Sequence, residues 1–255
     1  MLKRQNLWFF LDKIFQSLPE LKIGGKSIEQ VGTGCKLKYF KFVGHVLDDK
    51  LSWEGHVEHV CKKLSSSNFA INSTKHFLPQ NIRLSIYHSL FESHLNYGNI
   101  LWGTAKTKYL NKIENLQKRC IRNVALKKFK AHTEPIFKKF QILNFRDKLT
   151  YNRATFMHQY RHDKLPASFS GLFTEIISSD EFQSRHNFFN YVNIPSIKSC
   201  LEKYPLKQII SNWNSLSIDI KSTGDHDEFK SLLKETLLNN YRFEMDCPLN
   251  CFSCN

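Results

Sequence analysis

The sequence predicts an α+β protein that is mainly helical, with a short hairpin and strand region, a helical bundle and a less regular C-terminal region. Gly and Pro, which interrupt helices, are scarce, with 10 and 7 copies in 255 residues. The apolar share of 41% is close to the average for globular proteins. After residue 50 the apolar residues stop alternating and follow a helical repeat instead.

The first 50 residues carry the strand signals. Residues 1–18 predict a short helix of weak amphipathicity. Residues 21–23 and 27–31 predict a β-hairpin, because the Gly-Gly pair between them permits the positive φ angles of a tight turn. Residues 39–43, continued by residues 46–47, predict a third strand because aromatic and β-branched side chains dominate there.

A helical repeat then organises most of the remaining chain. Ser52 is placed to cap the first helix, and Pro79 to open the second from its first turn. The second helix is expected to bury the apolar stripe Ile82, Ile86, Tyr87, Leu90, Phe91 and Leu95. The helices are expected around residues 57–71, 82–95, 108–124, 133–140, 145–162, 208–216 and 227–241. These elements divide the chain into predicted regions of residues 1–50, 51–165 and 166–255.

The positive charge is concentrated in one block. The formal net charge is +14, and residues 106–164 hold 16 Lys or Arg against 4 Asp or Glu. A basic face of this kind indicates a polyanionic partner, although charged helical faces that are merely solvated are also common. The residues predicted to contact phosphates are Lys108, Lys112, Lys118, Arg119, Arg122, Lys127, Lys128 and Lys130. Nearby aromatic residues fit a core as well as they fit base stacking: Tyr109, Phe129, Phe137 and Phe140.

Patterns that suggest catalysis or metal binding have simpler explanations. Asp48 and Asp49 resemble the pair of aspartates that binds Mg²⁺ in polymerases. The residues after this pair lead into a helix, however, so we expect the two aspartates to end a strand. The spacing of His56 and His59 is weak evidence for a metal ion. A structural zinc site needs four ligands, and the cysteines near the C-terminus supply three: Cys247, Cys251 and Cys254. His226 could in principle be the fourth ligand, but it is distant in sequence. We therefore predict no catalytic and no metal-binding residue.

Cysteine usage and hydropathy indicate the compartment. The seven cysteines are odd in number, most are widely spread, and no secretory signal is recognisable, which predicts reduced thiols in the nucleus or cytoplasm. No stretch approaches the roughly 20 apolar residues that a membrane span requires. We expect no membrane partner.

Six segments together carry a family pattern. Three of them are YFKFVGHVLDDKLSW at residues 39–53, HLNYGNILW at residues 94–102 and WNSLSIDIK at residues 213–221. The other three occupy residues 21–31, 116–122 and 132–137. In this order they resemble the C-terminal part of the reverse transcriptase of jockey-like non-LTR (LINE) retrotransposons. His45 and Ser217 depart from the family pattern, which has Val and Pro there.

The resemblance implies a fold and a function. Residues 1–50 would be the end of the polymerase palm, and residues 51–165 a helical thumb that grips the template–primer duplex. The family synthesises DNA on an RNA template with Mg²⁺, but its catalytic aspartates lie upstream of the matched segments. The chain alone is therefore expected to be inactive, with no cofactor of its own. Its expected partners are an RNA or RNA–DNA duplex and the upstream palm and fingers of the same polyprotein.

Two other classes of function remain open on the sequence. One is a stand-alone protein that binds nucleic acid without polymerising it. The other is a decayed helical fragment that acts at most in protein–protein contacts.

Overall fold

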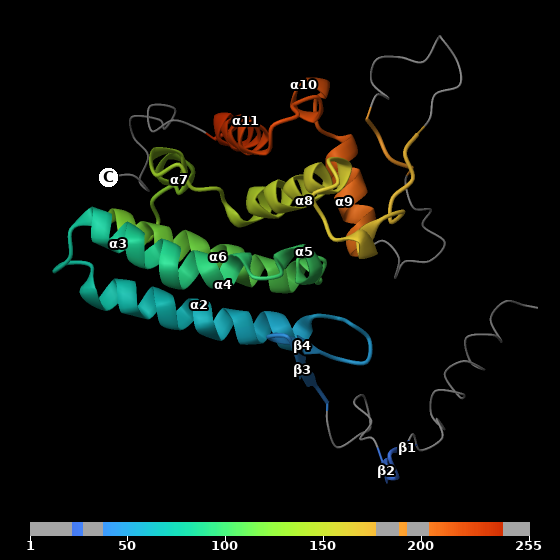
Figure 1. The fold of residues 1–255 in the computed structure, drawn as a ribbon. Helices are drawn as coiled ribbons and strands as arrows, with labels where there is room; N and C mark the ends of the chain where they lie inside the picture. The colour runs from blue at the N-terminus through green and yellow to red at the C-terminus, as the bar shows by residue number, and fades with distance from the viewer. Residues whose placement is uncertain (1–21, 28–37, 177–188, 193–203, 242–255) are drawn as a thin grey trace, which may run out of the picture.

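The computed structural model describes residues 22–27, 38–176, 189–192 and 204–241, and it is mainly helical with short antiparallel strands on its N-terminal side (Figure 1). The strands are β1 (Lys22–Ile23), β2 (Lys26–Ser27), β3 (Phe40–Phe42) and β4 (His45–Leu47). The helices of the bundle are α2 (Glu54–Thr74), α3 (Gln80–Ile86), η1 (Tyr87–Glu92), α4 (Ser93–Asn96), α5 (Asn99–Trp102), α6 (Thr107–Ala125), α7 (Glu134–Lys139) and α8 (Phe145–Arg161). The last ones are η2 (Ala167–Phe169), α9 (Pro205–Asn214), α10 (Ile218–Lys221) and α11 (His226–Asn239).

The first predicted hairpin is confirmed. β1 and β2 pair antiparallel, with Ile23 opposite Lys26. Gly24 and Gly25 form the turn with φ angles of 57° and 77°, which glycine adopts at little cost.

The single strand predicted at residues 39–47 is wrong, because the segment folds into a second hairpin. β3 pairs antiparallel with β4, and Phe42 lies opposite His45. The chain reverses at Val43 and Gly44, whose φ angles are 44° and 77°. The Tyr97 hydroxyl donates a hydrogen bond of 2.7 Å to the Val43 carbonyl, so a residue distant in sequence holds this turn.

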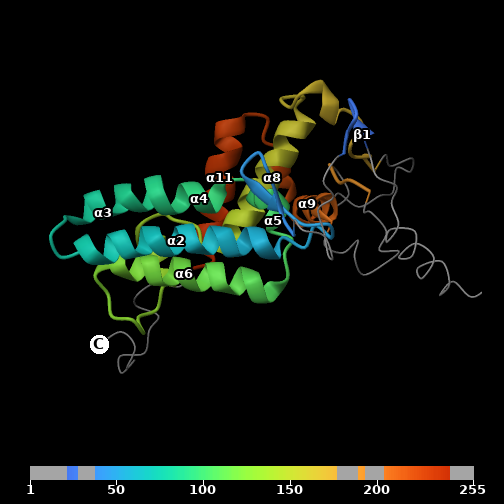
Figure 2. The same cartoon turned by 90° about the horizontal axis from the view of Figure 1, so that it is seen from below.

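Three helical rods form the body of the bundle. α2 packs against α6 and against the continuous rod α3–η1–α4, α3 also contacts α6, and the three run side by side (Figure 2). Their contact surfaces bury Val57, Leu64, Phe91, Ile113 and Val124. The apolar positions predicted along α2 and α6 are buried or pack against this core, which confirms both helices.

The apolar stripe predicted for the second helix is partly wrong. Tyr87, Phe91 and Leu95 are buried, but Ile82 and Leu90 are 42% and 45% exposed. η1 is a π-helix, so the turn that contains Leu90 is wider than an α-helical turn. The wider turn does not explain Ile82, which precedes it in α3. Even at the regular spacing of about 100° per residue, Ile82 and Leu90 lie roughly 60° or more from the side that carries Tyr87, Phe91 and Leu95, so the six positions do not form one face.

α8 joins the bundle to the C-terminal helices. It lies between the three rods and the helices α9 and α11 (Figure 1). Its first half contributes Phe145 and Leu149 to the bundle core. Its second half contributes Ala154 and Met157 to a second core that includes Trp213. One helix therefore belongs to both cores.

Several predictions fall outside the described residues. These are the helix at residues 1–18, most of the strand at residues 27–31 and the three C-terminal cysteines. Within the described part, Cys61 and Cys120 are free thiols.

Candidate nucleic-acid interface

One face of α6 carries most of the predicted cationic residues. At about 100° per residue, Lys108, Lys112, Arg119 and Arg122 fall within an arc of roughly 80°. The opposite side of α6 is buried in the bundle core through Ile113, Cys120, Ile121 and Val124. The amphipathic pattern of the sequence therefore positions these four cations on the outside of the bundle.

The C-terminal half of this face borders a groove between α2 and α6. The groove has a volume of about 470 Å³. Four cationic residues line it: Lys75, Arg119, Arg122 and Lys127. Among the described residues that line the groove, none is Asp or Glu. We call this feature the α2–α6 groove.

Two asparagines form a bridge across the groove. Asn123 on α6 donates a side-chain hydrogen bond of 3.0 Å to Asn68 on α2. The ammonium of Lys75 donates to the Asn123 side chain at 3.2 Å and to Asn72 Oδ1 at 2.9 Å. Amide oxygens orient Lys75 but carry no charge, so its positive charge stays available to an anion in the groove.

Arg122 links the groove to the loop after α6. Its Nε donates to the Ala131 carbonyl at 2.7 Å, and burial lowers the pKa of its guanidinium. The guanidinium lies 6.0 Å from the centre of the Phe129 ring. This contact places an aromatic ring and a cation together at the edge of the groove.

Two exposed aromatic rings border the groove. Phe69 on α2 and Phe129 on the loop after α6 are each 71% exposed. Exposed phenylalanines beside cations are the arrangement on which nucleic-acid bases stack. Of the other aromatic residues considered in the sequence, Tyr109 and Phe137 are buried and Phe140 packs against the core.

The sequence around the groove is free of acidic residues. Residues 59–91 and 115–133 contain ten Lys or Arg and no Asp or Glu. These segments supply the C-terminal halves of α2 and α6 and most of the α3–η1–α4 rod. These two segments therefore give their end of the bundle an excess of positive charge.

The predicted cations are not all equivalent in the fold. Lys118 lies off the common face and pairs with Glu114 at 2.7 Å, and Arg146 also reaches Glu114 at 3.2 Å. Lys108 and Lys112 lie 4.5 Å and 5.5 Å from the centre of the Tyr109 ring, toward the other end of α6. The last two predicted cations, Lys128 and Lys130, are exposed on the loop after α6.

The sequence did not identify Lys75 or Phe69 as part of a site. Both come from α2, and their place beside Arg119 follows from how α2 packs on α6. A signal was present for Phe69, because it lies out of phase with the buried positions Leu64 and Ile71 of the same helix.

The residues considered for metal binding have structural partners. The Asp48 carboxylate follows β4 and accepts hydrogen bonds from the backbone amide and the hydroxyl of Ser52. The N-cap of α2 is Trp53, so the prediction of Ser52 at that position was off by one residue. His56 Nδ1 accepts from the Val46 amide at 3.2 Å. Within the described ranges, no group of three His, Cys, Asp or Glu side chains is arranged to hold a metal ion.

Comparison with protein-family models, curated proteins and solved structures found no match to this chain. In the part of the chain that the structure describes, no helix is long and apolar enough to cross a membrane.

Proposed function

We propose that this chain binds nucleic acid through the α2–α6 groove and the adjoining cationic face of α6. The observation that supports this is the groove lining, which combines four cations with two exposed phenylalanines and, among the residues that the structure describes, no carboxylate. Cations attract phosphates regardless of sequence, and the rings offer stacking surfaces for bases. None of the chain's residues is proposed to be catalytic.

The resemblance narrows the partner to the template–primer duplex of a reverse transcriptase. The residues of the groove belong to the segment that the resemblance assigns to the thumb. On this proposal the chain holds an RNA–DNA hybrid for an active site located elsewhere. The stand-alone binding protein is the alternative, and it predicts the same groove without any polymerase partner.

Salt dependence of hybrid binding tests the proposal. Four phosphate contacts should weaken the affinity for a labelled RNA–DNA hybrid roughly 100-fold between 50 and 200 mM salt. Fluorescence anisotropy at several salt concentrations measures this. Weak binding that does not change with salt would contradict both the template–primer proposal and the alternative of a stand-alone nucleic-acid-binding protein.

Charge reversal in the groove tests its location. Changing Lys75, Arg119 and Lys127 to Glu should remove most of the hybrid affinity and reduce the salt slope by roughly three. The control carries the same change in charge at Lys50, Lys164 and Lys234, which lie outside the groove. Equal losses in the two variants would mean that the charge acts diffusely over the surface.

A protein contact at the second hairpin is also proposed, because its outer surface is apolar. Phe40, Phe42 and Val43 are 51%, 59% and 67% exposed. The resemblance assigns this hairpin to the end of the palm, so the proposed partner is the upstream palm. Co-expression with a palm fragment should protect the β3 amides from hydrogen exchange, and unchanged exchange would contradict the contact.

A further inference from the structure

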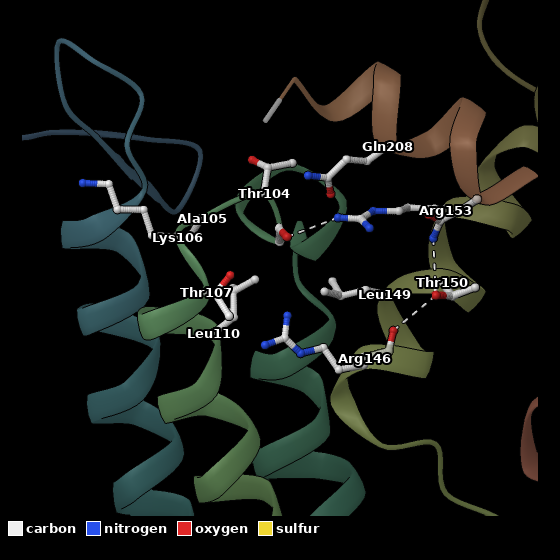
Figure 3. A pocket seen from close by; sticks show the side chains of 12 residues that line it. Thr104, Ala105, Lys106, Thr107, Leu110, Arg146, Leu149, Thr150, Arg153 and Gln208 are labelled. Carbon is white, nitrogen blue, oxygen red and sulfur yellow. Dashed lines mark hydrogen bonds between the residues drawn. The ribbon is translucent and has the colours of Figure 1, made fainter. Parts of the chain in front are cut away.

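A second cationic pocket lies at the opposite end of α6 from the groove. It has a volume of about 560 Å³ and lies between the start of α6, α8 and α9 (Figure 3). Arg146 and Arg153 of α8 line it together with Thr104, Thr107 and Gln208. Among the described residues that line this pocket there is no Asp or Glu. From Thr107 to Arg122 the distance along α6 is about 20 Å, so the pocket and the groove are separate.

Arg153 is buried in this pocket, and no acidic residue in the described ranges forms an ion pair with it. Its side chain is 7% exposed, and the one hydrogen bond it makes to a described residue runs from Nη2 to the Gly103 carbonyl at 3.2 Å. Its Nε is buried and meets no hydrogen-bond acceptor within the described part of the chain. Burial, and then the charge of Arg146, lower the pKa of Arg153 to about 10, so it stays protonated at neutral pH. A buried guanidinium whose Nε lacks an acceptor favours an anion beside it.

The start of α6 adds a second source of positive potential. α6 has 19 residues, its N-cap Lys106 makes no side-chain cap, and its first turn holds no acidic residue. The amides of Tyr109 and Leu110 both bond to the Lys106 carbonyl. In the described part of the chain, the two amides before them have no acceptor. An uncapped helix start of this length carries about half a positive charge directed at the pocket.

The side chains around the pocket match an oxyanion. In Figure 3 the side chains of Arg153 and Gln208 extend toward Thr104, and the side chain of Arg146 extends toward Thr107 and Leu110, with Leu149 between the two arginines. Lys106 points away from them. The positive charge of Arg146 is partly offset, because its Nε pairs with Glu114 at 3.2 Å. Arg153 and the start of α6 have no acidic partner among the described residues, which suits a doubly charged anion better than a neutral group.

We propose that this pocket binds a phosphate group, held by the Arg153 guanidinium, the first amides of α6 and the hydroxyl of Thr107. The volume falls within the range of small-molecule sites, about 300–1,000 Å³, so a phosphate can enter with the sugar that carries it. The phosphate belongs either to a free nucleotide or to the 5′ end of a nucleic acid. This inference does not depend on the α2–α6 groove.

Amide chemical shifts of the full chain test the proposal. Titration with inorganic phosphate should give saturable shifts at residues 103–110 and 146–153. Adenosine monophosphate should shift the same amides, whereas adenosine should not. Absence of saturable phosphate shifts at these residues overturns the proposal.

A charge placed in the pocket gives the second readout. Thr107→Asp sets a carboxylate at the first turn of α6, where it suits the helix dipole and occupies the anion position, so the variant should fold and lose at least tenfold in phosphate affinity. Gln80→Asp makes a similar change at the start of α3, away from the pocket, and should keep wild-type affinity. Equal affinities in the two variants overturn the proposal.

A further experiment distinguishes a free nucleotide from the 5′ end of a nucleic acid as the source of the phosphate. Oligonucleotides with a 5′-phosphate or a 5′-hydroxyl are compared for shifts at residues 103–110. Shifts specific to the 5′-phosphate identify a nucleic-acid end as the ligand. Shifts with adenosine monophosphate but with neither oligonucleotide identify a free nucleotide. Both results support the phosphate site.

Discussion

The side chain of Asn123 donates a hydrogen bond of 3.0 Å to that of Asn68, and this bond joins the two helices that form the α2–α6 groove. The two residues lie 55 positions apart in sequence. Asn68 is 8% exposed, so its amide is nearly removed from water. Because Lys75 bonds to the same Asn123 side chain, the pair also fixes the position of one groove cation.

Removing this bond should lower stability. Asn68→Ala leaves the Asn123 amide unpaired and should cost about 1–2 kcal/mol, which lowers Tm by about 4 °C in a protein of this size. Calorimetry on the two single variants and on the double Asn68→Ala, Asn123→Ala variant completes a mutant cycle. A coupling near zero would show that the two amides contribute independently.

Arg83 is predicted to be a structural cation and not a binding one. It is 5% exposed, and it donates to the carbonyls of Val124, Lys75 and Leu78 at the ends of α6 and α2. Arg83→Met leaves these buried acceptors unpaired and should cost about 3 kcal/mol. Arg119→Met on the exposed face should change stability by less than about 0.5 kcal/mol. Urea denaturation of the two variants compares them, and equal midpoints would contradict this role.

The helices were largely predictable from sequence, because each buries one face and the spacing of its apolar residues shows which face that is. The end of α6, for example, was predicted at Val124 and lies at Ala125. The turn at Val43 and Gly44 was not predictable, because the residues on both sides continue a strand-like pattern. Its conformation depends on Tyr97, which a helical segment brings to it.

The cationic residues were predictable, but their grouping was not. Residue types alone make Lys118 and Arg119 equivalent. In the fold Lys118 pairs with Glu114, whereas Arg119 lines the groove beside Lys75. Only the packing of α2 on α6 decides which cations share a surface.

Some residues of the family-like segments are explained by packing. The Gln117 side chain donates at 3.0 Å to both the Tyr87 hydroxyl and the Leu143 carbonyl. The Trp213 indole donates to the Phe189 carbonyl at 2.7 Å. Such residues stabilise the fold. A resemblance that rests on them is therefore stronger evidence for a shared fold than for a shared activity.

The exposed phenylalanines should contribute to binding without contributing to stability. Phe69→Ala and Phe129→Ala should each weaken the affinity for single-stranded or hybrid nucleic acid by about 1–2 kcal/mol if bases stack on these rings. Stability and salt slope should stay nearly unchanged, because the rings are exposed and uncharged. Phe77→Ala is the matched control, since Phe77 is 87% exposed and does not line the groove. An equal effect of all three changes would remove the stacking role.

The protein should lose stability in mild acid through His56. The His56 ring is 2% exposed, and burial, followed by the charges of His45, His59 and Lys63, lowers its pKa to about 4. Its folded-state pKa lies below the unfolded value of about 6.5, so the unfolded state binds the proton more tightly. Stability is therefore full above pH 6.5 and falls as the pH drops toward 4.

Between pH 7.5 and 5.0, protonation of His56 should lower the free energy of unfolding by about 2 kcal/mol. Other histidines with lowered pKa act in the same direction, so the comparison requires a variant. His56→Gln keeps an acceptor for the Val46 amide but does not titrate, and its Tm should fall less than that of the wild type. Parallel Tm profiles for the two proteins would show that His56 is not responsible.

Gly98 is predicted to be irreplaceable at the junction between the second hairpin and the bundle. Its φ is +60°, and an added Cβ would lie 2.0 Å from Nε2 of His45. The His45 ring stacks on Tyr97 at 5.1 Å and lies 4.9 Å from His56, so it cannot move away without disturbing both. Gly98→Ala should therefore cost more than the roughly 1 kcal/mol of left-handed backbone strain alone.

Hydrogen exchange locates the effect of Gly98→Ala. The Val46 amide, which bonds to His56, should lose protection before the amides in the middle of α6 do, because displacement of His45 releases the hairpin first. Gly224→Ala serves as the control, since an added Cβ there meets nothing within 4 Å. Uniform loss of protection over the whole bundle would mean that the hairpin and the helices unfold as one unit. It would contradict the expectation that the hairpin is released first.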